Sequence, residues 1–344
     1  MGGFLNWFWN PRVWLPPGTD WKDIVPNEKV NYTRFEDLYV YPIPFAICII
    51  ILRFFVERLV FYPLGEAYGL TKRRILVPPN PYLERHYKLK SSVDVILKKS
   101  DLDKSQVLAW LRKRKRLDKP STLDKFSECS WRFTCYAISV LVGIWTLYDK
   151  PWFSDINKCW YDFPHHSIDN DVWWYYMLGS AFYWSLMISQ FFDVQRKDWG
   201  QMCLHHMTTI ALLGFSWTCN MIRMGTLVLL LHDIADPFLE LAKTTRYIGF
   251  HRACDWFFGT FAILFIITRL IIYPGVILKS TMYEAPMILP MFAAYYIFNS
   301  MLLILLGLHV FWTYFILKVA VKALRSGQVD DARSSSETSG EESS

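Results

Sequence analysis

Residues 198–241 read DWGQMCLHHMTTIALLGFSWTCNMIRMGTLVLLLHDIADPFLEL. Two apolar stretches in this segment have about the length of membrane helices, yet they contain the pair His205-His206 and the acids Asp233 and Asp236. One Asp near the centre of a membrane helix costs about 2.5–3.5 kcal/mol on insertion scales, so two cost roughly 5–7 kcal/mol. Ionisable side chains at such depth are usually paired and functional. We therefore expect the chemistry of the protein in this segment.

The composition predicts an all-α polytopic membrane protein. The 344 residues are 53% hydrophobic and 20% charged, and the 16 Trp, 19 Tyr and 25 Phe suit aromatic belts at both lipid interfaces. We expect about seven transmembrane helices, because seven apolar stretches approach the ~20 residues that a span needs. These stretches lie near 39–60, 131–149, 173–193, 203–219, 222–241, 256–278 and 291–317.

Lys and Arg gather in alternate connections between these spans. They are dense in the connector 71–120 and recur after the third, fifth and seventh spans. Because positively charged loops remain in the cytosol, residues 1–38 are predicted to be luminal and the C-terminus cytosolic. The sequon Asn31-Tyr32-Thr33 lies in the predicted luminal segment, so we expect glycosylation at Asn31.

The two ends of the chain carry further expectations. The start, MGGFLNWFWNPR, has no basic residues followed by an apolar core and a cleavage site, so we expect the first span, 39–60, to be an uncleaved anchor. The tail 326–344 is rich in Ser and Glu and is predicted to be disordered. Ser334, Ser336 and Ser339 lie near acidic residues and form a candidate phosphorylation tract; a merely solvating tail is the alternative.

The connector 71–120 contains SDLDKSQVLAWLRKRKRLDKP, which predicts a capped helix, a turn and a second helix ending in a basic run. This pattern is similar to the last two helices of a homeodomain, with Trp110 and Leu111 at core positions. A DNA-binding homeodomain would need Asn where Lys113 stands, so no nucleic-acid partner is expected. We expect the basic run to meet the anionic cytosolic leaflet or to attract a phosphate-bearing substrate.

The polar residues of 198–241 form a pattern. In one helix Asp233 and Asp236 share a face, which His232 flanks, while His205 and His206 lie about 100° apart on the preceding helix. The link between the two helices is short, so both sets should lie at similar depth toward the cytosol. A neutral imidazole is a competent base or nucleophile, and a carboxylate on its other nitrogen fixes its tautomer. Hydrogen bonds that only join the helices are the alternative use.

Two more polar side chains lie inside predicted spans. Arg269 is expected to balance a carboxylate of the site or to bind a substrate hydroxyl, with snorkelling to an interface as the alternative. Asn299 lies in the last span.

A metal site is not expected. Membrane di-iron oxidases need clustered histidines, whereas the remaining five of the eight His are scattered over different loops and helices: His86, His165, His166, His251 and His309.

Residues 182–243, from FYWSLMISQFFDV through CLHHMTT to LHDIADPFLELAK, resemble the Lag1 motif of the TLC domain in ceramide synthases. The N-terminal WFWNPRVWLPPGTDW, the homeobox-like connector and the acidic Ser tail resemble the animal members of that family. One departure is Gly18-Thr19-Asp20, where relatives often carry a glycosylation sequon. The resemblance implies a TLC-domain bundle of six transmembrane helices over 125–325.

The implied reaction is N-acylation of a sphingoid base, sphinganine or sphingosine, by a fatty acyl-CoA, with no cofactor besides this co-substrate. Carried over by position, the catalytic residues are His205, His206, Asp233 and Asp236, and His232, Arg269 and Asn299 are candidates for substrate binding. Two mechanisms are open. The acyl group passes through His205 as an acyl-imidazole, which the resemblance favours, or a His only deprotonates the ammonium of the base.

The resemblance also implies an endoplasmic reticulum membrane location and an association of the predicted loop 279–290 with acyl-chain preference. The expected partners are fatty acyl-CoA, a sphingoid base, the lipid bilayer and a related synthase chain in a homo- or heterodimer. The alternative is a non-enzymatic TLC-type protein for lipid binding or trafficking. Such a protein would not need the His and Asp pairs together.

Overall fold

A computed structural model of the chain describes residues 7–28, 30–71, 77–97, 102–118, 120–193 and 196–326. Within these ranges every regular element is a helical segment, which confirms the all-α prediction. The segments used below are α2 (Pro11–Trp14), α4 (Pro42–Val56), α5 (Tyr62–Ala67), α6 (Pro81–Lys88), α7 (Val93–Leu97), α8 (Lys104–Leu117), α9 (Thr122–Leu147), α10 (Pro151–Ser154), α11 (Asn170–Ser189), α12 (Trp199–Thr218), α13 (Ile222–Asp233), α14 (Asp236–Tyr247), α15 (His251–Ile266), the π-helical η4 (Ile267–Leu278) and η5 (Ser280–Glu284), α16 (Ala285–Ile288) and α17 (Ala293–Ser326).

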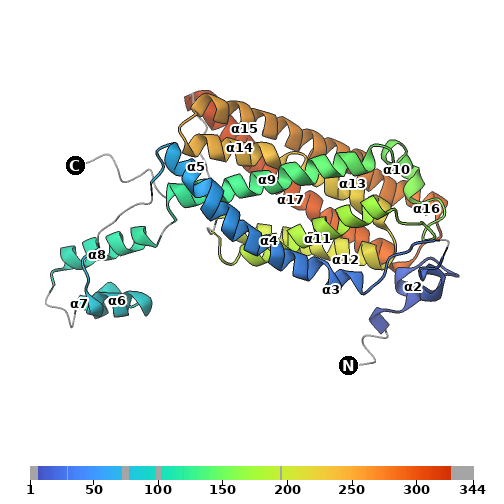
Figure 1. Ribbon diagram of the computed structural model, residues 1–344, viewed down its shortest axis with the longest axis horizontal. Coiled ribbons are helices and arrows are strands. Elements are labelled where there is room, and N and C mark those ends of the chain that lie inside the picture. The colour runs from blue at the N-terminus through green and yellow to red at the C-terminus, as the bar shows by residue number, and fades with distance from the viewer. Residues whose placement is uncertain are drawn as a thin grey trace.

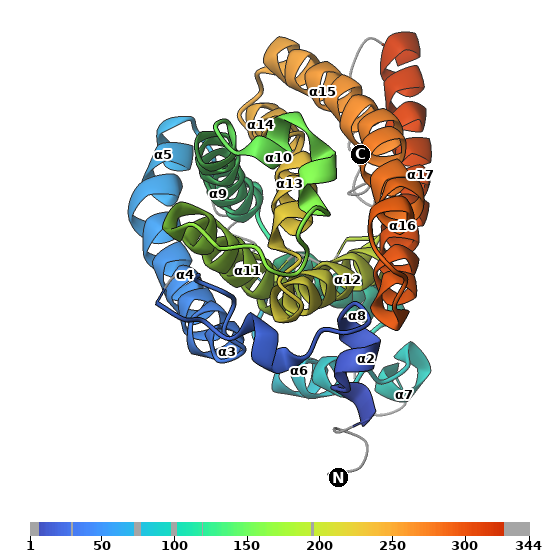
Figure 2. The same cartoon turned by 90° about the vertical axis from the view of Figure 1, so that its right-hand side faces the viewer.

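The long helices lie side by side in an elongated bundle (Figure 1). One end of the bundle carries α2, α10 and α16, and the other carries α5 and the small unit α6–α8; we call these the α2 end and the α8 end. Seen along its length, α9, α11, α12, α17, α15 and α14 form a ring, α13 lies within it, and α4 packs outside against α11 (Figure 2). The ring positions the polar side chains of α12 and α13 toward the interior.

Among the described residues, three helices are long and apolar enough to cross a membrane, namely Asp37–Ala67, His251–Ile288 and Ala293–Ala323. The other predicted spans are also helical, as α9, α11, α12 and the pair α13–α14. Polar side chains lower the mean hydropathy of α9, α11 and α12, whereas α13 and α14 have only 12 residues each. The multi-helix membrane architecture is therefore supported, and the number of seven spans stays a prediction.

Two predicted boundaries are wrong. The span 222–241 is not one helix, because α13 ends at Asp233 and α14 begins at Asp236. Pro237 has no amide hydrogen to donate and its ring crowds the preceding turn, which interrupts the helix. The predicted loop 279–290 is helical as far as Ile288, through η5 and α16.

The connector folds as a small unit around Leu83, Ile96, Val107 and Trp110, which are buried together. The prediction of two helices in its basic segment is wrong: one helix, α8, spans Lys104–Leu117, and two shorter helices precede it. Asp103 explains the start of α8, because its side chain forms a reciprocal cap with Gln106.

The sequon residue Asn31 is exposed, while its backbone carbonyl accepts a 2.8 Å hydrogen bond from Ile168 N–H. Its glycosylation stays a prediction. The tail beyond Ser326, with its candidate phosphorylation tract, lies outside the described residues.

A network of largely buried charges joins the first span to the ring. Asp193 lies 2.8 Å from the guanidinium of Arg53 on α4 and 2.8 Å from that of Arg132 on α9. Arg132 also lies 3.0 Å from Glu128, which pairs with Arg196 at 3.4 Å. Asp193 thus neutralises two arginines from different helices.

Asp193→Asn should destabilise the bundle by about 3–5 kcal/mol, because it leaves two buried guanidinium groups without their shared carboxylate. Thermal unfolding in detergent would measure the change. Glu284→Gln is the matched control: its partner Lys279 has a side chain that is 63% exposed, so losing that 3.0 Å pair should cost only about 0–1 kcal/mol. Equal melting temperatures of the two variants would contradict the assignment.

Candidate active site

His205 and His206 follow one another on α12, and both are buried. Their ring centroids lie 5.6 Å apart. The ring of His205 also meets the indole of Trp312 on α17, edge to face, at 5.5 Å. Nδ1 of His205 is buried and has no hydrogen-bond partner. His205 therefore keeps at least one ring nitrogen free of protein hydrogen bonds.

His206 is held in one orientation by Gln190 at the end of α11. The side-chain nitrogen of Gln190 donates to the Trp199 carbonyl at 2.8 Å, so its oxygen faces His206. Nδ1 of His206 lies 2.8 Å from that oxygen. Because an amide oxygen only accepts, Nδ1 must carry the proton. A neutral His206 then has its lone pair on Nε2, the form that can act as a base.

Asp233 is fully buried and accepts two hydrogen bonds from other helices. Ser139 on α9 donates at 2.6 Å and Tyr183 on α11 donates at 2.8 Å. The Tyr183 ring lies 6.4 Å from the ring of His205 and 6.4 Å from that of His206. Tyr183 thus stands between the histidine pair and the carboxylate.

Asp236 lies at the start of α14 and pairs with Arg269 of η4, whose Nη2 is 3.3 Å from the carboxylate. Arg269 also donates to the backbone carbonyl of His232. The Asp236 side chain is 22% exposed, in contrast to that of Asp233. The expected direct contact between a carboxylate and a catalytic imidazole is absent among the described residues. Each acid has a different partner.

His232 pairs with a residue that the sequence pattern did not single out. Its Nδ1 lies 2.7 Å from the Val228 carbonyl, and its Nε2 lies 3.1 Å from Nε2 of His309 on α17. His309, which was left outside the predicted site as one of five scattered histidines, is fully buried, and its ring also packs on Tyr273 at 5.0 Å.

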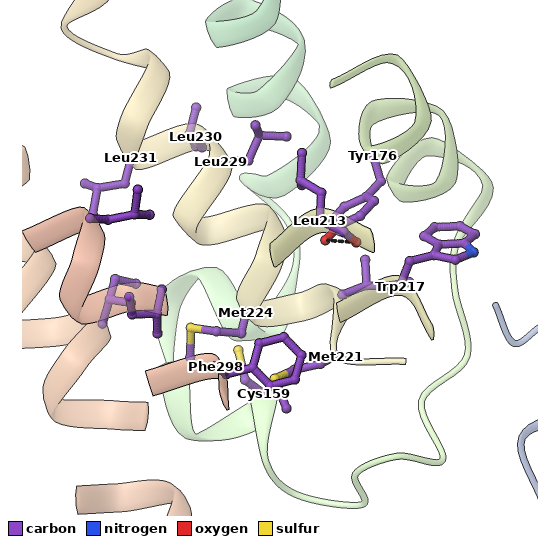
Figure 3. Packing of buried hydrophobic residues seen from close by; sticks show 14 of the residues in the cluster. Cys159, Tyr176, Leu213, Trp217, Met221, Met224, Leu229, Leu230, Leu231 and Phe298 are labelled. Atoms are coloured by element: carbon purple, nitrogen blue, oxygen red, sulfur yellow. Dashed lines mark hydrogen bonds between the residues drawn. The ribbon is translucent and has the colours of Figure 1, made fainter. Parts of the chain in front are cut away.

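A cavity with a volume of about 70 Å³, counted as the space open to the centres of water-sized spheres, lies within the ring. Thr209, Tyr183 and His232 line it beside the histidine pair, and Phe298 and Met291 line it nearer the α2 end. Figure 3 shows part of the apolar packing here, with Met221, Met224 and Phe298 gathered together. Thr209 is one turn from His205 on α12, so the cavity wall comes within one turn of the histidine pair, although neither His205 nor His206 is itself part of that wall.

Asn299 also lines this cavity. Its side-chain nitrogen donates to the Tyr295 carbonyl at 2.9 Å, while its oxygen is buried without a partner. An unpaired buried acceptor of this kind suits a polar group of a ligand.

Five contributors to the site were not predicted: Ser139, Tyr183, Gln190, His309 and Trp312. Gln190 and His309 carried a signal, since each is a polar residue in an apolar helix. Nothing in the sequence distinguished Tyr183 and Trp312 from the many other aromatic residues. No group of three His, Cys, Asp or Glu side chains in the described part of the chain is arranged to hold a metal ion. That no metal is needed stays a prediction.

Comparisons with known proteins agree on one family. The TLC domain matches residues 125–318. The chain is 40% identical to ceramide synthase 3 of Mus musculus, covering 97% of this chain and 88% of the relative. It is 39% identical to ceramide synthase 5 of Homo sapiens, covering 98% and 88%, and 35% identical to ceramide synthase 4 of Bos taurus, covering 97% and 87%. The chain therefore belongs to the TLC-domain proteins and, among them, to the ceramide synthase family.

Proposed function

We propose that this protein is a ceramide synthase that transfers a fatty acyl group from acyl-CoA to the amine of a sphingoid base, sphinganine or sphingosine. The single observation that carries the proposal is an apolar cavity whose wall includes Tyr183, the neighbour of a buried histidine pair in which His206 has a defined tautomer. A lipid tail needs such a cavity, and acyl transfer needs a base or nucleophile at its end.

The first half of the reaction uses His205. A neutral ring nitrogen of His205 attacks the thioester carbon, and the bond between carbon and sulfur breaks. The proton that His205 loses ends on the departing sulfur, so that CoA leaves as the thiol. The free nitrogen of His205 and the nearby apolar wall support this role.

The second half uses His206. The free amine of the sphingoid base attacks the acyl carbon, its proton passes to Nε2 of His206, and the bond to His205 breaks. The proton then returns to His205, which restores the starting state. Direct attack of the amine on the thioester, with a histidine acting only as base, is the other route.

The acids support this centre in different ways. Asp233 orients Tyr183, which lines the cavity next to both histidines. Asp236 is partly exposed and lies 3.3 Å from Arg269, which supports a role in attracting the ammonium of the sphingoid base. Asn299 is placed to accept a hydrogen bond from a polar substrate group.

The proposed membrane setting combines the family resemblance, the sequon at Asn31 and the distribution of Lys and Arg. An endoplasmic reticulum membrane, a luminal N-terminus glycosylated at Asn31 and a cytosolic C-terminus place the basic connector on the side where acyl-CoA arrives. A homo- or heterodimer with related synthases and phosphorylation of the tail belong to the same proposal.

The purified protein should form ceramide from acyl-CoA and sphinganine, and His206→Ala should lower kcat by roughly 10²–10⁴-fold because a general base is lost. His205→Ala should lower it further. Product can be measured by mass spectrometry. His165→Ala, at an exposed histidine, is the control and should retain full activity. Full activity of the His205 variant would contradict the site. No activity of the wild type would favour a lipid-binding protein instead.

Gln190→Leu should reduce kcat by roughly 5- to 150-fold, because removing a buried hydrogen-bond acceptor costs about 1–3 kcal/mol and frees His206 to adopt the other tautomer. Gln190→Glu is the matched variant. It keeps an acceptor for Nδ1–H of His206, loses the donation to Trp199 and adds a negative charge that makes His206 more basic. Because the tautomer of His206 is kept, Gln190→Glu should lose less activity than Gln190→Leu at a pH high enough to keep His206 neutral. Equal losses in both variants would show that the Trp199 contact is what matters.

A further inference from the structure

Aromatic side chains close the cavity at the α2 end. Phe298 lines the cavity and is 6% exposed. Phe292, also in the wall, stacks on Phe163 from the connection between α10 and α11, with ring centroids 6.1 Å apart. An acyl chain whose carbonyl lies at His205 would run toward this aromatic wall. The wall therefore limits how much of the chain the cavity accepts.

A second layer lies behind this wall and comes from the N-terminal segment. Trp14, the last residue of α2, is fully buried. Its ring packs on Phe215 of α12 at 4.7 Å and on Phe298 of α17 at 6.5 Å. α2 lies at this end of the bundle beside α12 (Figure 2). Trp14 thus fills the space between two helices that flank the cavity.

The N-terminal segment is built to hold this ring in place. The indole nitrogen of Trp14 donates to the Phe8 carbonyl at 2.6 Å, so its polar atom is satisfied inside the segment. The indole nitrogen of Trp21 donates to the Trp9 carbonyl at 2.9 Å, which closes the segment on itself. What Trp14 presents to Phe298 is therefore only apolar surface.

We propose that Trp14 is a positioning residue for acyl-chain length, which backs Phe298 and so fixes the closed end of the cavity. This inference rests on the proposed function, and it assigns a specificity role to a segment outside the TLC domain. Removing the indole would leave a void directly behind Phe298. Because protein interiors are close-packed, Phe298 could move into that void and lengthen the cavity.

Trp14→Ala should shift the preference toward longer saturated acyl-CoAs. One methylene that a hydrophobic pocket accepts or rejects changes kcat/KM by roughly 10- to 200-fold. We expect at least a roughly tenfold rise in kcat/KM for a longer acyl-CoA relative to palmitoyl-CoA, measured across a chain-length panel. Trp14→Phe, which keeps a ring behind Phe298, should retain most of the wild-type preference. Arg12→Ala, at an exposed side chain of α2, is the control from the same segment.

Phe298→Ala changes the wall itself and keeps the test decisive if Trp14→Ala does not fold. It should show the same shift toward longer acyl chains. Combining Trp14→Ala with Phe298→Ala should add little to this shift, because both residues act on the same closed end of the cavity. An unchanged length profile in a folded Trp14→Ala or in Phe298→Ala would overturn the proposal. So would an equal shift in the control Arg12→Ala.

The length profile can also be measured without turnover, as the increase in melting temperature that each acyl-CoA of the panel produces. A wild type that shows no turnover would refute the proposed function. The thermal profiles of wild type and Trp14→Ala would still test the inference, because identical profiles contradict it and a shift to longer chains supports it.

Discussion

A carboxyl group buried in the interior of a membrane bundle must be hydrogen-bonded, and Asp233 meets this requirement through side chains of two other helices. Ser139 and Tyr183 donate to its two oxygens, so α9, α11 and α13 meet at one fully buried group. The same Tyr183 lines the cavity and lies beside both histidines of α12. The position of the histidine pair relative to the cavity therefore depends on this bond.

The rest of the site follows from similar constraints. Gln190 fixes His206 from the end of α11, and Arg269 holds Asp236 where Pro237 interrupts the helix. Trp312 and His309, both on α17, close the ring against α12 and α13. The polar groups thus lie near the middle of the bundle, while the cavity runs from them to an aromatic wall near the α2 end. In the proposed reaction, this arrangement separates the place of bond formation from the place where chain length is limited.

The sequence predicted the all-helical fold and pointed to the two helices that carry the site. It did so because a buried His or Asp is costly in an apolar helix, so its presence is informative. It did not reveal Tyr183, Ser139 or Trp312, since these residue types are common in this chain and their contacts depend on how distant helices pack. The prediction of a hydrogen bond between a carboxylate and an imidazole was wrong because this contact, too, depends on how distant helices pack. Pro237 indicated the break before Asp236, but a continuous helix was predicted because the apolar pattern continues through this position.

The central claim is that His205 carries the acyl group at the end of the cavity. The most direct test is to mix the purified wild type with acyl-CoA in the absence of any sphingoid base and to measure its intact mass, followed by peptide mapping. The account predicts an acyl increment on the peptide that contains His205. The increment should be absent in His205→Ala and should disappear from the wild type when sphinganine is added. A wild type that forms ceramide with both substrates but never shows an acyl increment with acyl-CoA alone would contradict it.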